Sequence, residues 1–226
     1  MTRAAVLVMA KAPVPGEAKT RLGDRVGHEA AADLAAACIL DTLTVCAEAF
    51  PDAAMRHVAL AGDLDRAVRS DELREQLAGW TVHPQRGEGF AQRLANAHLD
   101  VARATRVPVV QIGMDTPHVT AGQLTAVADV VGRDNDAVLG AAEDGGWWVL
   151  AVTDPRLALG LTSVEMSTAR TYADTLAVLK AAGATVVGTD VLRDVDTVDD
   201  ADLAAGLAPH TRFAQQWSAL GGGVSR

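Results

Sequence analysis

The stretch "DAVLGAAEDGGWWVLAV", residues 136–152, contains two short apolar runs separated by four residues. The runs are "DAVLGAA" and "WWVLAV", and residues 143–146 lie between them. Four residues are too few for the helix that joins parallel strands, so this pair is predicted to form an antiparallel hairpin that turns at "DGG". A sheet that contains both strands is therefore mixed.

On either side of this hairpin, apolar runs rich in β-branched residues alternate with helical patterns. The strand-like runs are "AAVLVMA", "RHVALAG", "WTVHP", "VPVVQIG" and "ATVVG". Helical patterns occur near residues 27–49, 64–78, 89–104, 120–132, 168–182 and 198–207. This alternation predicts an α/β fold with a mostly parallel sheet between layers of helices. We expect one domain over residues 1–220 and a disordered tail, "GGGVSR", at residues 221–226.

The composition limits the kinds of partner that the protein is expected to bind. The 226-residue chain carries a formal net charge of -9 at pH 7, which repels nucleic-acid phosphates and anionic membrane surfaces. No apolar run approaches the roughly 18 residues of a membrane span, and signal-peptide features are missing, so we expect a cytoplasmic protein with no nucleic-acid or membrane partner. The segment "HTRFAQQWSAL" is expected to pack either on the domain or on a second subunit, which leaves a homodimer open.

The loop after the first strand reads "KAPVPGEAKTRLG", residues 11–23. Ligands of open α/β sheets bind beyond the carboxyl ends of the strands, so this loop is a candidate site. It has neither the Walker A spacing nor "G-x-G-x-x-G". A proline turn leads instead into a helix start that carries Lys19 and Arg21. Helix N–H groups and two cations are suited to a polyphosphate; the alternative is a solvated turn with surface cations.

A second candidate is "QIGMDTPHVTAGQL", residues 111–124. Its strand ends at Gly113, Asp115 follows, and Pro117 stops the strand from continuing. One carboxylate at a rigid strand end is a common way to hold Mg²⁺, which takes its other ligands from water and substrate phosphates. The alternative is that Asp115 forms an Asx-type turn or caps the helix that begins near Thr120.

A third candidate is "LRDVDTVDDADLAA", residues 192–205. Thr197 and Asp200 resemble a capping box, which accounts for two of its polar residues. Asp194 and Asp196 alternate around Val195 and are predicted to face one side together. Like charges so close need a cation between them, and a metal ion is the simplest one.

Four motifs, "KAPVPGEAKTRL", "GMDTP", "GAAEDGGWW" and "DVDTVDDADL", resemble in their order and spacing the DUF2064 family, also called rSAM/selenodomain-associated transferase 1. The resemblance runs from about residue 4 to 207. This family belongs to the GT-A, or nucleotide-diphosphosugar transferase, superfamily, alongside 2-phospholactate guanylyltransferase and the molybdenum-cofactor nucleotidyltransferases. The resemblance implies a three-layer α/β/α sandwich and a nucleotide-dependent transferase.

Residue roles follow from the same resemblance. It implies that Mg²⁺ or Mn²⁺ binds Asp115 and Asp196, and that Lys19, Arg21 and Asp115 are catalytic. The nucleotide is expected to contact Lys11, Ala12, Pro13, Gly16, Lys19, Arg21, Gln85, Arg86, Gly87, Arg93 and Gly113. The second substrate is expected to contact Glu143, Asp144, Gly145 and Gly146, whose two acids are exposed turn residues in the alternative interpretation.

Two reactions fit this fold. In nucleotidyl transfer an acceptor attacks the α-phosphorus of an NTP and pyrophosphate leaves; in glycosyl transfer an NDP-sugar gives up its sugar. A triphosphate needs cations around its β and γ phosphates, and Lys11, Lys19 and Arg21 supply three in one loop. We expect a nucleotidyltransferase with a small phosphorylated or anionic acceptor. A glycosyltransferase and a non-catalytic nucleotide-binding module are the alternatives. The base stays unassigned, because Gly89 and Ala91 depart from the family's usual "GDLGxRL".

Overall fold

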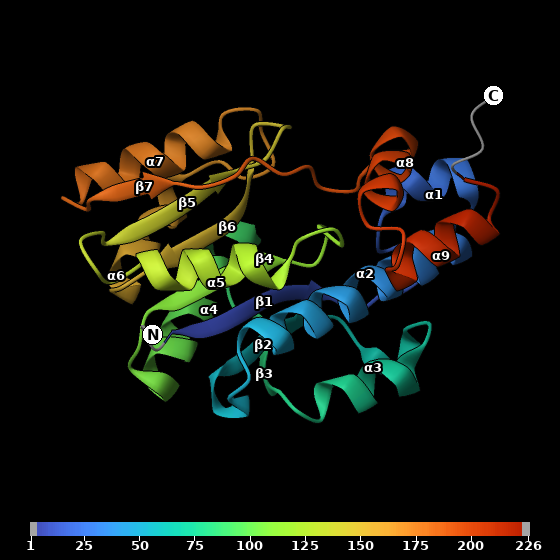
Figure 1. The fold of residues 1–226 in the computed structure, drawn as a ribbon, viewed down its shortest axis with the longest axis horizontal. Coiled ribbons are helices and arrows are strands. Elements are labelled where there is room, and N and C mark those ends of the chain that lie inside the picture. Colours follow the sequence, from blue (N-terminus) through green and yellow to red (C-terminus); the bar gives the residue numbers. More distant parts are fainter. Residues whose placement is uncertain (1–3, 223–226) are drawn as a thin grey trace.

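The computed structural model describes residues 4–222 (Figure 1). Its strands are β1 Ala5–Lys11, β2 Arg56–Ala61, β3 Thr81–Pro84, β4 Val109–Gly113, β5 Ala137–Ala141, β6 Trp147–Val152 and β7 Val186–Gly188. Its α-helices are α1 Thr20–Val26, α2 His28–Ala49, α3 Ser70–Leu77, α4 Gly89–Thr105, α5 Ala121–Val130, α6 Pro155–Ala158, α7 Thr171–Ala181, α8 Val198–Leu207 and α9 Arg212–Ala219. Short 3-10 helices span Ala53–Met55, Leu64–Arg66 and Leu159–Ser163.

The seven strands form one sheet in the order β3-β2-β1-β4-β6-β5-β7. Strands β1, β2, β3 and β4 pair in parallel, and so do β5 and β7. Strand β6 runs antiparallel to both neighbours, with Val152 opposite Val109 and Ala137. The mixed sheet and the hairpin are therefore confirmed. The chain leaves β1 toward β2 on one side and later places β4 on the other, so the carboxyl ends of β1 and β4 flank a topological switch point.

Apolar side chains cover both faces of the sheet, and α2 and α5 lie on the opposite face from α4 and α7 (Figure 1). Val6 and Val8 of β1 face α2 and α5, whereas Leu7 and Met9 face α4, because successive strand residues point to opposite faces. A third cluster, away from the sheet, joins α1 and α2 to α8 and α9. The expected three-layer α/β/α arrangement is confirmed.

Helix α2 corrects one expectation. It is the one helix within residues 4–222 that is long and apolar enough, by length and composition, to cross a membrane. However, 72% of that apolar window is buried inside the protein, where α2 packs on β1, α5 and α9. Its apolar surface therefore belongs to the core of this fold.

The C-terminal segment packs on the domain itself. Phe213 and Trp217 of α9 are buried against α2 and α8 in the third cluster. Gly221 and Gly222 form the turn that ends α9, since their N–H groups donate to the carbonyls of Ser218 and Trp217 at 3.0 and 3.1 Å. The rest of the expected tail, residues 223–226, lies outside the described residues. The homodimer and the single domain over residues 1–220 stay predictions.

Candidate active site

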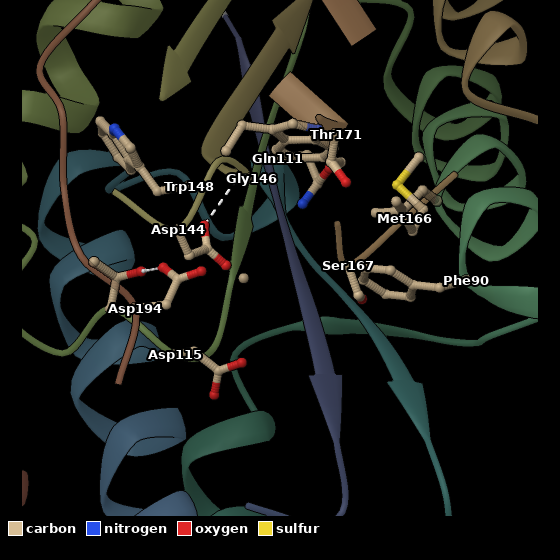
Figure 2. Close-up of a pocket in the computed structure, with 14 residues that line it drawn as sticks. Phe90, Gln111, Asp115, Asp144, Gly146, Trp148, Met166, Ser167, Thr171 and Asp194 are labelled. Atoms are coloured by element: carbon tan, nitrogen blue, oxygen red, sulfur yellow. Dashed lines mark hydrogen bonds between the residues drawn. The ribbon is translucent and has the colours of Figure 1, made fainter. Parts of the chain in front are cut away.

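Two neighbouring cavities lie at the carboxyl ends of the central strands. The basic cavity, of about 270 Å³, is lined by residues that include Lys11, Lys19, Gln85, Arg93, Asp115 and Asp196. The Gln111 cavity, of about 150 Å³, is lined by residues that include Leu94, Gln111, Trp147, Met166, Asp144 and Asp194 (Figure 2). Phe90, Gly113 and Asp115 line both, so the two cavities meet at the end of β4.

Lys19 connects three separate segments. It precedes α1 in a left-handed conformation, with φ 48°, and its side chain is only 4% exposed. Its Nζ lies 2.5 Å from Asp115 Oδ1 and 3.9 Å from Asp196 Oδ1, and it donates to the carbonyl of Val195. Burial by itself lowers the pKa of Lys19. The nearby charges, among them those of Asp115 and Asp196, raise it by more than burial lowers it, so the pKa of Lys19 lies above its ordinary value. Lys19 is thus a permanently charged centre of the site.

The other cations of the first loop take different positions. Lys11 is exposed in the basic cavity, and its Nζ donates to the carbonyl of Glu17 at 2.7 Å. Arg21 is 80% exposed, lies 3.7 Å from Asp196 and faces a separate acidic hollow that includes Glu143. The three cations that line the basic cavity are therefore Lys11, Lys19 and Arg93.

Other predicted residues of this loop shape it. The N–H of Ala12 donates to the carbonyl of Ala61 at 2.8 Å, and the carbonyl of Pro13 accepts from Val68 N–H at 3.1 Å. Gly16 turns the loop with φ 77°, a conformation that favours glycine. These contacts hold the loop against the end of β2.

The segment after β3 contributes two of its four predicted residues. Gln85 lines the basic cavity, although its Nε2 donates to the carbonyls of Ala10 and Ala59, both at 2.9 Å. Arg93 also lines it, with Nε 3.5 Å from the carbonyl of Gly87. Arg86 is instead bound through one nitrogen to both oxygens of Asp100, at 2.5 and 2.7 Å. Gly87 has φ 122° and serves the turn into α4.

Of the four predicted hairpin residues, two line the Gln111 cavity and two do not. Asp144 and Gly146 line the Gln111 cavity, and Asp144 Oδ1 accepts from Gly146 N–H at 2.8 Å. Glu143 forms an ion pair with Arg193 at 2.6 Å. Gly145 has φ 92°, and a Cβ there would lie 2.3 Å from the carbonyl oxygen of Ala169. Gly145 therefore allows the hairpin to meet the loop before α7.

Three carboxylates gather at the mouth of the Gln111 cavity, from Asp115, Asp144 and Asp194 (Figure 2). Asp194 Oδ1 accepts from the hydroxyl of Thr116 at 2.9 Å. Burial, together with the neighbouring carboxylates, raises the pKa of Asp194 to about 7. Asp196 lies near Lys19 and Arg21. Asp194 lines the Gln111 cavity and Asp196 lines the basic cavity, and both acids also line the acidic hollow that Arg21 faces.

The donor set fits a divalent cation that takes only part of its ligands from the protein. Within residues 4–222 no three His, Cys, Asp or Glu side chains are arranged to hold a metal by themselves. Asp115, however, is 39% exposed where the cavities meet, and its charge contributes to the raised pKa of Asp194. Mg²⁺ and Mn²⁺ accept such carboxylates and complete their shells with water and phosphate oxygens.

Gln111 is a site residue that the sequence patterns missed. It lies in β4 between Val110 and Ile112, is 2% exposed and lines the floor of the Gln111 cavity. Its side chain hydrogen-bonds with His98 of α4, an interaction that raises the pKa of His98 against the larger, lowering effect of burial. Such mutual contact is expected, because an unpaired buried polar atom costs about 1–3 kcal/mol. The sequence feature that could have indicated this site residue is the single polar residue, Gln111, within the otherwise apolar run "VPVVQIG".

The loop before α7 is another part of the site that the sequence patterns did not predict. Met166 and Ser167 line the Gln111 cavity on the same side as Phe90 (Figure 2). Ser167 has φ 62°, a left-handed conformation that costs a non-glycine residue about 1–2 kcal/mol. Thr171 anchors the loop, because its hydroxyl donates to the carbonyl of Glu165 at 3.0 Å. The sequence offers no motif here from which the contact with the cavity could be read.

With this geometry in place, comparison with known proteins gives the family. Residues 42–168, more than half of the chain, match DUF2064, which is described as an uncharacterized protein conserved in bacteria. This chain belongs to the DUF2064 family. No curated protein sequence matches it.

Solved structures share the fold of this DUF2064 protein. A "putative nucleotide-diphospho-sugar transferase" from Desulfovibrio desulfuricans G20 is 23% identical, with a TM-score of 0.82 over 97% of both chains. A cytidylyltransferase from Leptospira borgpetersenii is 13% identical, with a TM-score of 0.58 over 98% of this chain and 94% of that one. Rv0371c from Mycobacterium tuberculosis H37Rv, in complex with manganese, is 20% identical, with a TM-score of 0.50 over 90% and 98%. The fold is therefore that of nucleotide-sugar and nucleotidyl transferases.

Proposed function

We propose that this DUF2064 protein is a metal-dependent transferase that binds a nucleotide in the basic cavity. One observation carries the proposal: Lys11, Lys19 and Arg93 line the same cavity as Asp115 and Asp196. Cations beside carboxylates at a strand end suit a polyphosphate bound together with a divalent metal ion. The cavity also lies at the switch point of the sheet, where open α/β folds bind ligands.

The side chains that line the basic cavity would have different roles, according to where each one lies. Lys11, at the end of β1, and Arg93, in α4, would hold the outer phosphates. Lys19, which is buried beside Asp115, would offset charge that develops on the reacting phosphate. A bound Mg²⁺ or Mn²⁺ would neutralise phosphate charge, with Asp115 and either Asp194 or Asp196 as its protein ligands.

Nucleotidyl transfer from an NTP is the reaction that we favour. Three cations around one cavity match a triphosphate better than a diphosphate, although Arg93 replaces Arg21 as the third. Glycosyl transfer is the second candidate, because the adjoining Gln111 cavity would also accommodate the sugar of an NDP-sugar next to Asp115. Both reactions need the same metal and the same phosphate contacts, so the donor distinguishes them.

Thermal-shift measurements with each NTP and with UDP- and GDP-sugars test this function. We expect stabilisation by an NTP with Mg²⁺ or Mn²⁺, and its loss on addition of EDTA. Lys11→Ala should weaken NTP binding at least tenfold, about 1.4 kcal/mol, whereas Lys180→Ala on α7 should leave it unchanged. Asp115→Asn should remove the metal dependence. Preference for an NDP-sugar would favour glycosyl transfer, and metal-independent binding would contradict both reactions.

A further inference from the structure

We propose that the ion pair between Lys19 and Asp115 keeps the metal site closed before nucleotide binds, and that a nucleotide polyphosphate opens the site by drawing Lys19 away from Asp115. The metal ion would then bind together with the nucleotide and not before it. This inference rests on the proposed function, in which a polyphosphate occupies the basic cavity and the metal ion binds Asp115. The oxygen atoms around Lys19, its burial and its place in the basic cavity support it.

Lys19 occupies the point at which three oxygen atoms of the site converge. Its Nζ lies 2.5 Å from Asp115 Oδ1 and 3.9 Å from Asp196 Oδ1, and it donates to the carbonyl of Val195. Carboxylate and backbone carbonyl oxygens are also ligands that hard divalent ions take in proteins. The ammonium group of Lys19 and a metal ion would therefore compete for the same oxygen atoms.

The carboxylate oxygen that faces Lys19 is closed to an ion from solvent. Asp115 Oδ1 is buried, although the side chain of Asp115 as a whole is 39% exposed. The side chain of Lys19 is only 4% exposed, so water and salt screen its charge weakly. A divalent ion that approached Asp115 would meet this ammonium group directly beside the carboxylate and would be repelled by it. Tight binding of the ion at Asp115 therefore requires that Lys19 moves first.

A metal ion alone cannot release Lys19, because it offers the ammonium group no new partner. A buried charge that loses its counterion is strongly destabilising. An anion that replaces Asp115 beside Lys19 removes this cost. The opening of the metal site is therefore expected to depend on an anion that reaches Lys19.

In the proposed function, the basic cavity provides that anion. Lys19 lines the cavity together with Lys11 and Arg93, so a polyphosphate held by Lys11 and Arg93 would lie beside Lys19. A lysine has a flexible four-carbon stem, which allows Nζ to turn from Asp115 to a phosphate without movement of the backbone. Asp115 would then be free for the metal ion, and the phosphates and water would supply its other ligands.

Removal of Lys19 distinguishes this role from a simple phosphate contact. We would measure Mn²⁺ binding to the full chain without nucleotide, from the loss of the electron paramagnetic resonance signal of free Mn²⁺. Lys19→Met should bind Mn²⁺ about tenfold more tightly than the wild-type protein, or more, because Asp115 has lost its partner. Lys11→Met removes an exposed charge from the same cavity but leaves the ion pair in place, and it should change this affinity by less than about threefold.

A double variant shows where the additional Mn²⁺ binds. Asp115→Asn in the Lys19→Met protein should return the Mn²⁺ affinity to the wild-type value or below it. Two results would overturn the inference. One is an equal gain in Lys19→Met and Lys11→Met, which would be a general effect of charge. The other is a gain in Lys19→Met that persists in the double variant, because the ion would then bind away from Asp115.

The wild-type protein gives a second measurement, which does not depend on the folding of a variant. The chain has three lysines, Lys11, Lys19 and Lys180, so ¹³C-lysine labelling gives three Cε signals. Mg²⁺ alone should leave the Lys19 signal unchanged. Of ATP, CTP, GTP and UTP, the one that stabilises the protein most with Mg²⁺ should shift Lys19 and Lys11. Lys180, which is exposed on α7, is the internal control and should not move.

The outcomes separate this inference from the proposed function. An NTP with Mg²⁺ that shifts Lys11 and leaves Lys19 unmoved would sink the inference alone. Mg²⁺ alone that shifts Lys19 would also sink it, because the metal ion would then open the site without nucleotide. If none of the four NTPs shifts Lys11 or Lys19, the proposed function fails, and the opening by nucleotide fails with it.

Discussion

Lys19 shows how one side chain holds a site together. It is buried, it is paired with Asp115, and it reaches the carbonyl of Val195 from the opposite end of the chain. The sequence indicated a phosphate-binding cation, yet it gave no sign of these partners, because they lie about 100 and 176 residues away along the chain. Lys19 has therefore both a positioning role and, in the proposed function, a catalytic one.

Replacement of Lys19 tests both roles. Lys19→Met retains the length of the side chain and removes its charge. We expect at least a tenfold loss of turnover, about 1.4 kcal/mol of transition-state stabilisation, in an assay of pyrophosphate release. Lys180→Met is the matched control and should keep the wild-type rate. A Lys19→Met protein of normal activity would return the first loop to the solvated-turn interpretation.

His98 predicts a pH dependence of stability. Its pKa is about 4 in the folded protein because it is buried, against an ordinary value of about 6.5. The unfolded chain therefore binds the extra proton first, and stability should fall as the pH drops from about 6.5 to about 4. A shift of this size is worth on the order of 3 kcal/mol.

Urea denaturation at pH 8 and pH 5 measures this effect. The loss of unfolding free energy between the two pH values should be smaller in His98→Leu than in the wild-type protein. His210→Leu replaces an exposed histidine and should show the wild-type loss. An equal loss in all three proteins would mean that His98 does not carry the effect.

At the scale of elements, the β5–β6 hairpin could be predicted from the sequence, but its contact with the loop before α7 could not. The short spacing between β5 and β6 requires an antiparallel pair, whatever the rest of the chain does. The approach of Gly145 to Ala169 depends on where the loop before α7 packs, which no local pattern encodes. The same reason explains why Arg93 lines the basic cavity while Arg21 turns away: helix orientation decides the direction of each side chain.

Substitution of Gly145 should measure that contact. Gly145→Ala would add a Cβ 2.3 Å from a carbonyl oxygen, at φ 92°. Gly183→Ala is a matched control, because Gly183 has φ 85° but no atom within 4 Å of an added Cβ. Both should lose about 1 kcal/mol from backbone strain, and Gly145→Ala should lose at least about 1 kcal/mol more in urea denaturation. Equal losses would contradict the close approach.

At the scale of the whole molecule, the fold could be predicted because the sequence patterns that indicate it are local and recur along the chain. Alternating strand and helix patterns, strand ends marked by Gly113 or Pro117 and the motif order all indicate one architecture. The Gln111 cavity could not be predicted, because its walls come from α4, β4, β6 and the loop before α7, and only the packed sheet brings them together. Asp115 was found from its place at a strand end, a position that sequence does reveal.

The contact between Val195 and Asp115 has a consequence for synthesis of the chain. The N–H of Val195 donates to the carbonyl of Asp115 at 2.9 Å, and the Val195 carbonyl accepts from Lys19. A nascent chain acquires this closure only after residue 195 has emerged from the ribosome, when β1 through β7 are already made. In the proposed function, nucleotide would therefore bind only after the segment at Val195 has closed on Lys19 and Asp115, and it would not stabilise folding intermediates that lack this contact.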